Sequence, residues 1–399
     1  MNKYLLFLFL FCSQWTNGQI LPGIWRGELE LNDSTVLPFN FQAYSQNLDL
    51  INGEERIHVN DISLNNDSVS IQLSVFNSEF RCKMTDKTLR GYFYNYTRKN
   101  NNILSFNATQ NLSYRFTEHP LSPRSNLSGR CEVIFDDEKT KTKMAVGIFK
   151  QQGNYLTGTF LTTTGDYRYL EGEVSGNRLS LSAFDGSHAF LFHATILENG
   201  TLRGDFYSGS HFHETWSAFR NDSAELPDAE SLTFIKPGYD KLSFKFPDEN
   251  GDSVSISDSR FQNKVVIVTL TGTWCPNCMD ETKFLVDFYS QFKSKGVEII
   301  ALDFERVLDS STVKRSIDKL KKQLGVEYPV LFAGTNDRTA AAQSLPMLNH
   351  ILGYPTTIFI DKKGNVRKIH TGFSGPATGN DYIRFKESFT RFVEKLISE

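Results

Sequence analysis

The chain has 399 residues, with 43 Lys and Arg against 46 Asp and Glu, so its formal net charge is −3 at pH 7. A chain of this length exceeds what a single hydrophobic core ordinarily organises, and two or three domains are expected. The near balance of charge gives no support to nucleic acid or to an anionic membrane surface as a partner.

The N-terminal segment has the pattern of an export signal. Lys3 precedes an almost wholly apolar run at 4–11, and polar residues then lead to the small residue Gly18. The run is too short to span a bilayer, which requires about 20 residues. We therefore predict an exported, periplasmic mature chain without a transmembrane span, in a compartment where disulfides persist. A lipoprotein anchored through Cys12 is the alternative, but the bulky Phe11 before it disfavours that interpretation.

The segment 20–221 is β-rich and contains an internal repeat. Runs that alternate apolar and polar residues are separated by Asn, Gly and Asp turns. The sequence Thr-Leu-Arg-Gly-Tyr-Phe-Tyr at 88–94 recurs at 201–207 as Thr-Leu-Arg-Gly-Asp-Phe-Tyr. We expect two copies of about 95 residues, at 20–121 and 122–221. Each copy would be an antiparallel sheet, and the two would pack as sandwiches or join into one barrel.

Two cysteines of this β-rich region are candidates for a disulfide. Cys82 is on the inward side of an alternating strand, and Cys131 stands where the first copy has Trp25, also an expected core position. A bond between the two cysteines would close a loop of about 50 residues and contribute about 4 kcal/mol in the chain-entropy model. Two separately buried thiols fit the pattern at least as well.

Histidines of the second copy are a weaker candidate for a metal site. His211 and His213 alternate to the same side of a strand, as two ligands would, and His188, His193 and Glu214 lie nearby in the sequence. This copy has no clear set of acidic partners, and aromatic-rich sheets often carry surface histidines. We therefore expect no metal site.

The composition and the hydrophobic pattern of the chain change after residue 221. Residues 222–239 are mostly polar and include Pro227 and Pro237-Gly238, which is typical of a linker. From 240 to 399 strands and helices alternate, which indicates helices on both faces of a mixed sheet. The expected strands are 242–246, 264–271, 297–302, 328–332, 356–360 and 366–369, and the expected helices are 276–295, 313–324, 337–349 and 383–396. The fold class is thus multidomain: signal peptide 1–18, all-β 20–221, then α/β 240–399.

The sequence Trp-Cys-Pro-Asn-Cys at 274–278 is the strongest functional signal in the chain. It follows an apolar, β-branched run at 265–270, and Phe then recurs every four residues from 284 to 292, as on the buried face of a helix. Cys275 would therefore lie at a helix N-terminus, where unpaired N–H groups and the helix dipole stabilise thiolate over thiol. Cys278 follows one turn later, close enough to form a disulfide with Cys275.

Two other interpretations of this pair are disfavoured. Half of a zinc site would need further ligands, and the remaining cysteines, Cys12, Cys82 and Cys131, are not at metal-ligand spacing. An inert structural disulfide is the other alternative. The strand–turn–helix context favours a dithiol that cycles between open and bonded forms.

With these residues in place, the region from about 238 to 399 resembles the thioredoxin fold, and within it the exported thiol-disulfide oxidoreductases of the ResA/TlpA type. The matching segments are Gly-Thr-Trp-Cys-Pro-Asn-Cys at 272–278, Gly-Val-Glu-Ile-Ile-Ala at 296–301 and Gly-Tyr-Pro-Thr-Thr-Ile-Phe-Ile-Asp-Lys-Lys-Gly at 353–364. The resemblance covers about two fifths of the chain, and the motifs occur in the right order. It implies no metal and no organic cofactor.

The resemblance also implies roles for single residues. Cys275 would be the attacking thiolate and Cys278 the resolving thiol. Pro355 matches the proline that follows a cis peptide bond and faces the dithiol, so Tyr354 and Pro355 would present a backbone edge to an extended substrate. Trp274 matches the aromatic residue that precedes the pair and shapes the site.

One departure concerns the buried acid of the fold. Thioredoxins carry an Asp six residues before the first cysteine, where this chain has Thr269. Glu281 matches the acidic residue that ResA-like proteins place three residues after the second cysteine. Since residues i and i+3 share a helix face, Glu281 could exchange a proton with Cys278. A solvated glutamate beside Asp280 is the alternative.

The function indicated is an exported thiol-disulfide oxidoreductase, more a reductase than an oxidase. Its substrate would be a protein or peptide disulfide, with an apocytochrome in cytochrome c maturation as one candidate, and an upstream thiol-disulfide partner would supply electrons. A thiol peroxidase is disfavoured because Gly272, three residues before Cys275, stands where that class needs Thr or Ser. A partner- or glycan-binding module with an accessory thioredoxin domain is the alternative from another class.

Overall fold

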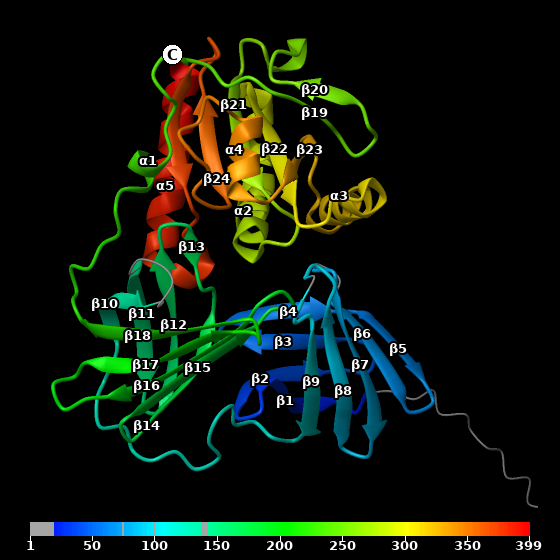
Figure 1. The fold of residues 1–399 in the computed structure, drawn as a ribbon, viewed down its shortest axis with the longest axis vertical. Coiled ribbons are helices and arrows are strands. Elements are labelled where there is room, and N and C mark those ends of the chain that lie inside the picture. The colour runs from blue at the N-terminus through cyan, green and yellow to red at the C-terminus, as the bar shows by residue number, and fades with distance from the viewer. Residues whose placement is uncertain (1–19, 74–75, 99, 137–142) are drawn as a thin grey trace, which may run out of the picture.

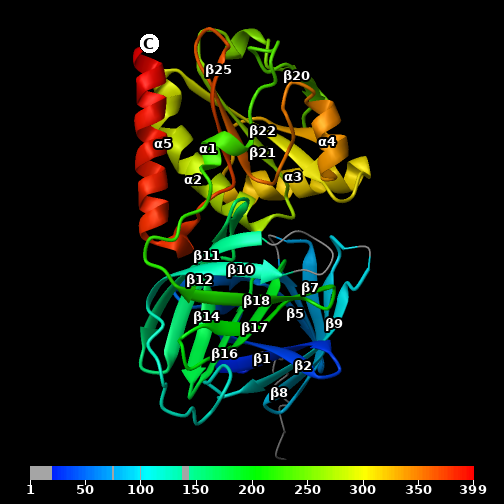
Figure 2. The same ribbon diagram turned by 60° about the vertical axis from the view of Figure 1, so that its left-hand side comes forward.

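The protein forms two β units that lie side by side and an α/β unit stacked across both (Figures 1 and 2). This computed structural model describes residues 20–73, 76–98, 100–136 and 143–399. The expected signal peptide and Cys12 lie outside these residues. None of the helices in the described ranges has the length and apolar character needed to cross a bilayer.

The first β unit is one antiparallel sheet of nine strands, in the order β4-β3-β2-β1-β9-β8-β7-β6-β5. Its two edge strands, β4 and β5, are joined in the chain by Asn60 alone, so the sheet is nearly closed. The strands are β1 (Gly23–Asn32), β2 (Thr35–Ala43), β3 (Leu48–Asn52), β4 (Glu55–Val59), β5 (Asp61–Asn65), β6 (Ser68–Leu73), β7 (Ser78–Thr85), β8 (Thr88–Asn95) and β9 (Ile103–Gln110).

The second β unit is a closed antiparallel barrel. The order of its sheet is β11-β10-β18-β17-β16-β15-β14-β12-β13, and the further pairing of β11 with β12 closes the ring. Closure leaves no long edge strand exposed. The strands are β10 (Gly129–Asp136), β11 (Lys143–Gln152), β12 (Tyr155–Thr162), β13 (Gly165–Asp166), β14 (Leu170–Ser175), β15 (Arg178–Phe184), β16 (Ala189–Ile196), β17 (Leu202–Ser208) and β18 (Phe212–Arg220).

The internal repeat corresponds to equivalent strands in the two β units. The repeated Leu-Arg-Gly sequences lie in β8 and β17, and each glycine is where a neighbouring strand comes close. A Cβ on Gly91 would lie 2.1 Å from the Arg81 carbonyl oxygen, and one on Gly204 would lie 1.7 Å from the His193 carbonyl oxygen. The repeat therefore preserves a contact that only glycine allows.

The two cysteines of the β units are free and buried, Cys82 in the sheet and Cys131 in the barrel. Of the two arrangements that the sequence left open, the structure has the separately buried thiols. Burial raises the pKa of Cys82 to about 12 and also raises the pKa of Cys131. Neither thiol has the electropositive, exposed surroundings that make a cysteine reactive.

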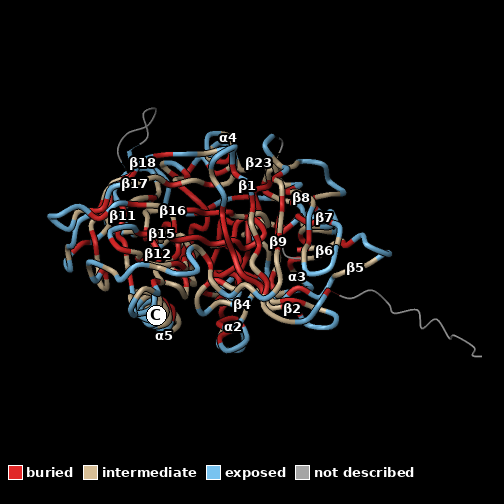
Figure 3. The backbone as a smooth tube through the Cα atoms, turned by 90° about the horizontal axis from the view of Figure 1, so that it is seen from below, coloured by how far each residue is buried: buried red, intermediate tan, exposed pale blue. Residues whose placement is uncertain are grey.

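The β units pack against each other through apolar and charged contacts. Phe184 and Leu191 of the barrel belong to the same apolar cluster as the core of the nine-stranded sheet, and buried positions run through the interior of both units (Figure 3). Arg115 is also buried between the units, where it donates to the Ile51 carbonyl at 2.6 Å and forms an ion pair with Glu171 at 2.7 Å.

The α/β unit contains a mixed five-stranded sheet in the order β23-β22-β21-β24-β25, with a two-stranded sheet beside it. The β21–β22 and β22–β23 pairs are parallel, while β24 and β25 run antiparallel. The elements are α1 (Ala229–Leu232), β19 (Lys245–Pro247), β20 (Ser253–Ser255), η1 (Ser259–Phe261), β21 (Val265–Thr271), α2 (Pro276–Phe292), η2 (Lys293–Lys295), β22 (Val297–Glu305), α3 (Ser310–Leu324), β23 (Val330–Thr335), α4 (Arg338–Ser344), β24 (Thr356–Ile360), β25 (Val366–Thr371), η3 (Pro376–Thr378) and α5 (Asn380–Ser398).

The α/β sheet is buried on both faces because successive residues of β21 point to opposite sides. Val265 and Ile267 pack with apolar residues of α2, α3 and α5. Val266 and Val268 pack on the other face with residues of α4 and with both cysteines of the 274–278 motif. This pattern explains why β21 has no exposed residue.

The segment expected to be a linker makes contacts with the α/β unit. Thr233 and Thr371 are joined through their hydroxyls at 2.9 Å, and Lys236 N–H donates to the Met347 carbonyl at 2.9 Å. Ile235 also forms an isolated β-bridge with Leu348. Residues 233–236 are therefore attached to the α/β unit.

Candidate active site

The Cys-x-x-Cys motif lies at the turn between β21 and α2. Cys275 is the N-cap of α2 with an extended backbone, and Pro276 occupies the first helical turn, where its lack of an N–H has no cost. The Cys278 N–H donates to the Cys275 sulfur at 3.3 Å. A thiolate on Cys275 would thus receive a backbone hydrogen bond and the positive end of the helix dipole.

The two cysteines are joined in a disulfide, with their Cα atoms 5.2 Å apart. Cys275 is 6% exposed and Cys278 is 1% exposed, so the first sulfur is the more accessible of two buried ones. The Cys275 sulfur also lies 3.7 Å from the Tyr354 carbonyl oxygen. The structure therefore brings the cysteine pair against the segment that immediately precedes β24.

Tyr354 and Pro355 form that segment, and the peptide bond between them is cis. The Tyr354 ring meets the Trp274 ring edge to face, with centroids 6.0 Å apart. The pair Trp274 and Cys275 is far in the sequence from the pair Tyr354 and Pro355, yet the fold brings the two pairs into contact.

Thr273 and Trp274, which precede the first cysteine, form hydrogen bonds with the end of β22. Trp274 Nε1–H donates to the Phe304 carbonyl at 2.9 Å, and the Thr273 N–H donates to the Glu305 carboxylate at 3.0 Å. The Arg306 guanidinium lies 4.1 Å from the Trp274 ring centroid, a cation–π contact. Burial lowers the pKa of Arg306 to about 10. These contacts fix the loop in front of the dithiol.

Glu281 is fully enclosed one turn after Cys278, with 1% exposure. Its two carboxylate oxygens accept hydrogen bonds from the hydroxyls of Thr269 on β21 and Thr357 on β24, each at 2.6 Å. Burial raises its pKa to about 7, although both hydroxyls act in the opposite direction. The alternative of a solvated glutamate is excluded. A carboxyl that titrates near neutral pH can both accept and return a proton.

The barrel also contacts the redox motif. Ser187 Oγ donates to the Trp274 carbonyl at 3.1 Å, and Asn277 Nδ2 donates to the Asp166 carbonyl at 3.0 Å. Thr164 lies so close to Gly353 that a Cβ there would be 2.6 Å from the threonine Cγ2. The barrel thus contacts residues on either side of the cysteine pair and the residue before Tyr354.

Three of the histidines considered as metal ligands have other partners. His188 lies 3.3 Å from Asp185, His193 lies 2.9 Å from Ser180, and His213 lies 2.8 Å from Asp205. Within the described ranges, no group of three or more His, Cys, Asp and Glu side chains is arranged to hold a metal ion.

Several residues at the site were not expected from the sequence. Asp303, Glu305 and Arg306 follow the apolar run of β22, and parallel pairing brings their end of the strand beside the end of β21. That rule could have found them, because the carboxyl ends of parallel strands meet at one edge. The barrel residues Asp166 and Ser187 lie more than 80 positions before the motif, and no local pattern marks them.

Comparison with known proteins agrees with this geometry. The Redoxin family model matches residues 225–382. The chain is 30% identical over 149 residues to the thiol-disulfide oxidoreductase ResA of Bacillus subtilis (strain 168), covering 37% of this chain and 75% of that protein. It is also 30% identical over 156 residues to ResA of Geobacillus kaustophilus (strain HTA426), covering 39% and 79%.

Solved structures with similar α/β units include a thioredoxin-family thiol:disulfide interchange protein from Chlorobium tepidum TLS. It is 23% identical, covers 40% of this chain and 95% of its own, and has a TM-score of 0.31. A thiol-disulfide oxidoreductase from Bacteroides fragilis NCTC 9343 is 18% identical, covers 37% and 99%, and has a TM-score of 0.28.

The α/β unit is thus a thioredoxin-like domain with a Cys-x-x-Cys dithiol, and the protein is a thiol-disulfide oxidoreductase. The chain belongs to the ResA family, with two β units in front of the shared domain.

Proposed function

We propose that this protein is an exported thiol-disulfide reductase that acts on protein or peptide disulfides through Cys275 and Cys278. The observation that carries the proposal is the position of Cys275 as the N-cap of α2, with Cys278 and the buried Glu281 following on the same helix. Membership of the ResA family supports the chemistry.

The first step is attack of the Cys275 thiolate on one sulfur of the substrate disulfide. A bond forms between Cys275 and that sulfur, the substrate S–S bond breaks, and the released substrate thiolate takes up a proton. The Cys278 N–H that points at the Cys275 sulfur favours the thiolate before attack.

The second step resolves the mixed disulfide. Cys278 gives its proton to the Glu281 carboxylate and attacks the Cys275 sulfur, which displaces the second substrate thiolate. That thiolate is protonated and leaves with its partner, so two electrons have passed from the dithiol to the substrate. An upstream thiol-disulfide donor then returns two electrons to the Cys275–Cys278 disulfide.

Substrate alignment falls to Tyr354 and Pro355, with Trp274 shaping the site. The Cys275 sulfur lies 3.7 Å from the Tyr354 carbonyl oxygen, so a chain laid along this backbone would bring its disulfide next to the nucleophile. The Trp274 ring contacts the Tyr354 ring and so borders the backbone along which the substrate chain would lie.

The β units supply partner recognition in this proposal, with boundaries at 20–121 and 122–221, a linker at 222–239 and the redox domain at 240–399. Separate apolar clusters fill the barrel and the α/β unit, which supports their division into domains. We place the protein in the periplasm on the strength of the segment from Lys3 to Gly18.

The test uses the full chain, reduced and then mixed with insulin. Wild type should reduce insulin disulfides, Cys275→Ser should abolish the activity, and Cys278→Ser should accumulate a mixed disulfide visible by mass spectrometry. Activity that survives Cys275→Ser, or a stable adduct on Cys278 in that variant, would overturn the assigned roles.

A further inference from the structure

Arg168 is a buried arginine of the barrel that reaches into the redox domain. It lies just after β13, its side chain is 6% exposed, and its backbone has φ of 56°, in the left-handed region. Few residues other than glycine adopt that conformation. The Asp166 carboxylate stabilises it here by accepting from the Arg168 N–H at 2.6 Å.

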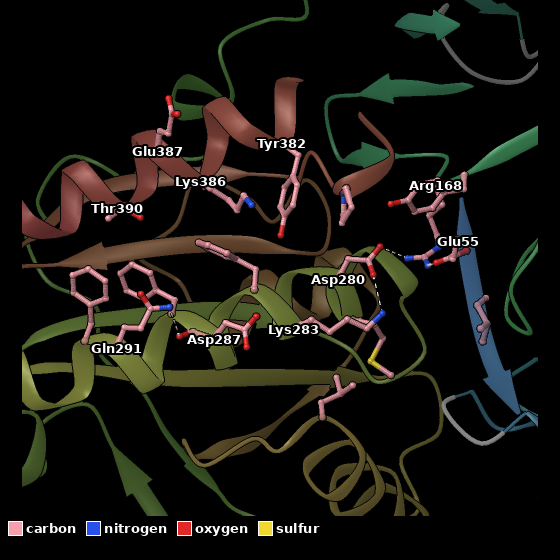
Figure 4. A pocket seen from close by; sticks show the side chains of 18 of the residues that line it. Glu55, Arg168, Asp280, Lys283, Asp287, Gln291, Tyr382, Lys386, Glu387 and Thr390 are labelled. Atoms are coloured by element: carbon pink, nitrogen blue, oxygen red, sulfur yellow. Dashed lines mark hydrogen bonds and ion pairs between the residues drawn. The ribbon is translucent and has the colours of Figure 1, made fainter. Parts of the chain in front are cut away.

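The Arg168 guanidinium joins all three units of the protein. It donates to the Pro276 carbonyl in the first turn of α2 at 3.2 Å and to the carboxylate of Asp280 one turn further on. It also pairs with Glu55 of β4 in the nine-stranded sheet and with Asp185 of the barrel, the latter at 3.3 Å. Figure 4 shows Arg168 between Glu55 and Asp280, beside a cavity of about 1230 Å³.

Neighbouring cations each pair with one of the carboxylates that surround Arg168, whereas Arg168 pairs with three of them. Lys283 pairs with Asp280 at 3.2 Å and His188 with Asp185 at 3.3 Å, but Arg168 is the cation common to three carboxylates. Burial alone would raise the pKa of Asp185, yet His188 and Arg168 lower it to about 2. Without Arg168, like charges from three units would face one another in a buried place, which is strongly unfavourable.

The turn before Arg168 lies on the substrate edge of the redox domain. Thr164 packs on Gly353, the residue before Tyr354, and a Cβ on Gly372 would come within 2.9 Å of the Thr163 carbonyl oxygen. Asp166 accepts a hydrogen bond from the Gly375 N–H at 2.6 Å and another from Asn277 at 3.0 Å. These contacts place the barrel turn directly beside the backbone edge that an extended substrate would use.

We infer that Arg168 is a positioning residue of the redox site: it fastens the barrel turn 162–168 to the first turn of α2 and thereby sets the accessibility of Cys275. The inference rests on the proposed function for its meaning, since it assigns the barrel a part in controlling which disulfides reach the nucleophile. Arg168 acts through Pro276 and Asp280 and not by touching sulfur.

The experiment measures alkylation of Cys275 by iodoacetamide in the reduced full chain, as a function of pH and with mass spectrometry to locate the label. The limiting rate at high pH reports accessibility, and the midpoint reports the thiol pKa. Arg168→Met should raise the limiting rate at least tenfold. Asp280→Asn should change it in the same direction, and Arg168→Lys should give an intermediate value because one ammonium cannot replace all the contacts.

The matched control is Arg115→Met, which removes a buried, ion-paired arginine between the two β units and away from the dithiol. It should lower the melting temperature and leave the Cys275 rate within twofold of wild type. If Arg168→Met does not fold, Asp280→Asn and Arg168→Lys decide the question.

Folded Arg168 and Asp280 variants with a limiting rate within twofold of wild type would overturn the inference. So would an equal rise in Arg115→Met, since that would make the effect one of general loosening. The readout does not depend on turnover of any disulfide. A failure of insulin reduction would therefore count against the proposed function and leave this result interpretable.

Discussion

The Thr269 hydroxyl donates a 2.6 Å hydrogen bond to the Glu281 carboxylate. Strand β21 thus offers a hydroxyl at the position where thioredoxins have an acid, and the acid itself comes from helix α2. Thr357 of β24 holds the other carboxylate oxygen at 2.6 Å, so the acid is fixed from two strands. The buried carboxyl that the family pattern places at the position of Thr269 is therefore present in this protein, but helix α2 contributes it.

Replacing Glu281 by Gln should slow thiol-disulfide exchange about 100-fold, a typical loss when a general base is removed. The rate of wild type should rise with pH through about 7, where Glu281 titrates, and this step should be missing from the variant. Stopped-flow measurement of mixed-disulfide resolution checks both points. A variant with an unchanged rate and pH profile would show that Glu281 takes no part in proton transfer.

The same substitution should change how stability depends on pH. The folded-state pKa of Glu281, about 7, lies above its ordinary value of 4.5. Its stabilising contribution is therefore fully present below pH 4.5 and is lost as pH rises through 7. The rise in the pKa of Glu281 from 4.5 to about 7 corresponds to about 3 kcal/mol of stability.

Urea unfolding of both proteins between pH 4 and 9 checks this prediction. The free energy of unfolding of Glu281→Gln should increase relative to that of wild type as pH rises through 7. Groups that titrate in both proteins cancel in the difference between the two curves. Asp287→Asn, on an exposed part of α2, is the control and should follow wild type. A constant difference between Glu281→Gln and wild type would contradict the raised pKa.

Cys275 should react with iodoacetamide at least tenfold faster than Cys278 in the reduced protein. The reasons are the N-cap position of Cys275 and its exposure of 6% against 1% for Cys278. Brief labelling followed by peptide mass spectrometry gives the ratio. Preferential labelling of Cys278 would mean that the roles of the two cysteines are reversed.

A redox fragment that starts at residue 222 should be more stable than one that starts at 238. The shorter fragment loses the Thr233–Thr371 and Lys236–Met347 hydrogen bonds and the packing of Ile235. At about 1 kcal/mol for each hydrogen bond, the loss should be about 2–3 kcal/mol. Thermal unfolding of the two fragments checks the difference, and equal stability would show that residues 222–237 are only a tether.

The thioredoxin-like domain could be predicted from sequence in most of its elements because its apolar periods are strong. The helix that starts at Pro276 and the strand that starts at Val297 were both placed correctly. The strand was expected to end at Leu302, because Asp303 breaks its apolar run, but β22 continues to Glu305 with both acids buried. The chain thereby places Glu305 and Arg306 at the site.

A strand expected at 242–246 was displaced. Leu242 and Phe244 are buried as their alternation predicts, but ladder pairing begins only at Lys245. Alternation reports which side chains are buried, whereas a strand also needs a partner backbone. The contacts of Arg168 with Glu55 and Asp280 join three units of the fold, and no spacing within the sequence announces them.

The reduction potential of the Cys275–Cys278 couple tests the central claim most directly. The full chain is equilibrated with glutathione or dithiothreitol mixtures of defined redox potential. The fraction of reduced Cys275–Cys278 is then determined by alkylation and mass spectrometry. The reduction potential of a reductase must be more negative than the potentials of the disulfides it reduces. We therefore expect a value more negative than about −200 mV, toward the thioredoxin value near −270 mV. A value near −120 mV, as in a strong disulfide oxidant, would contradict it.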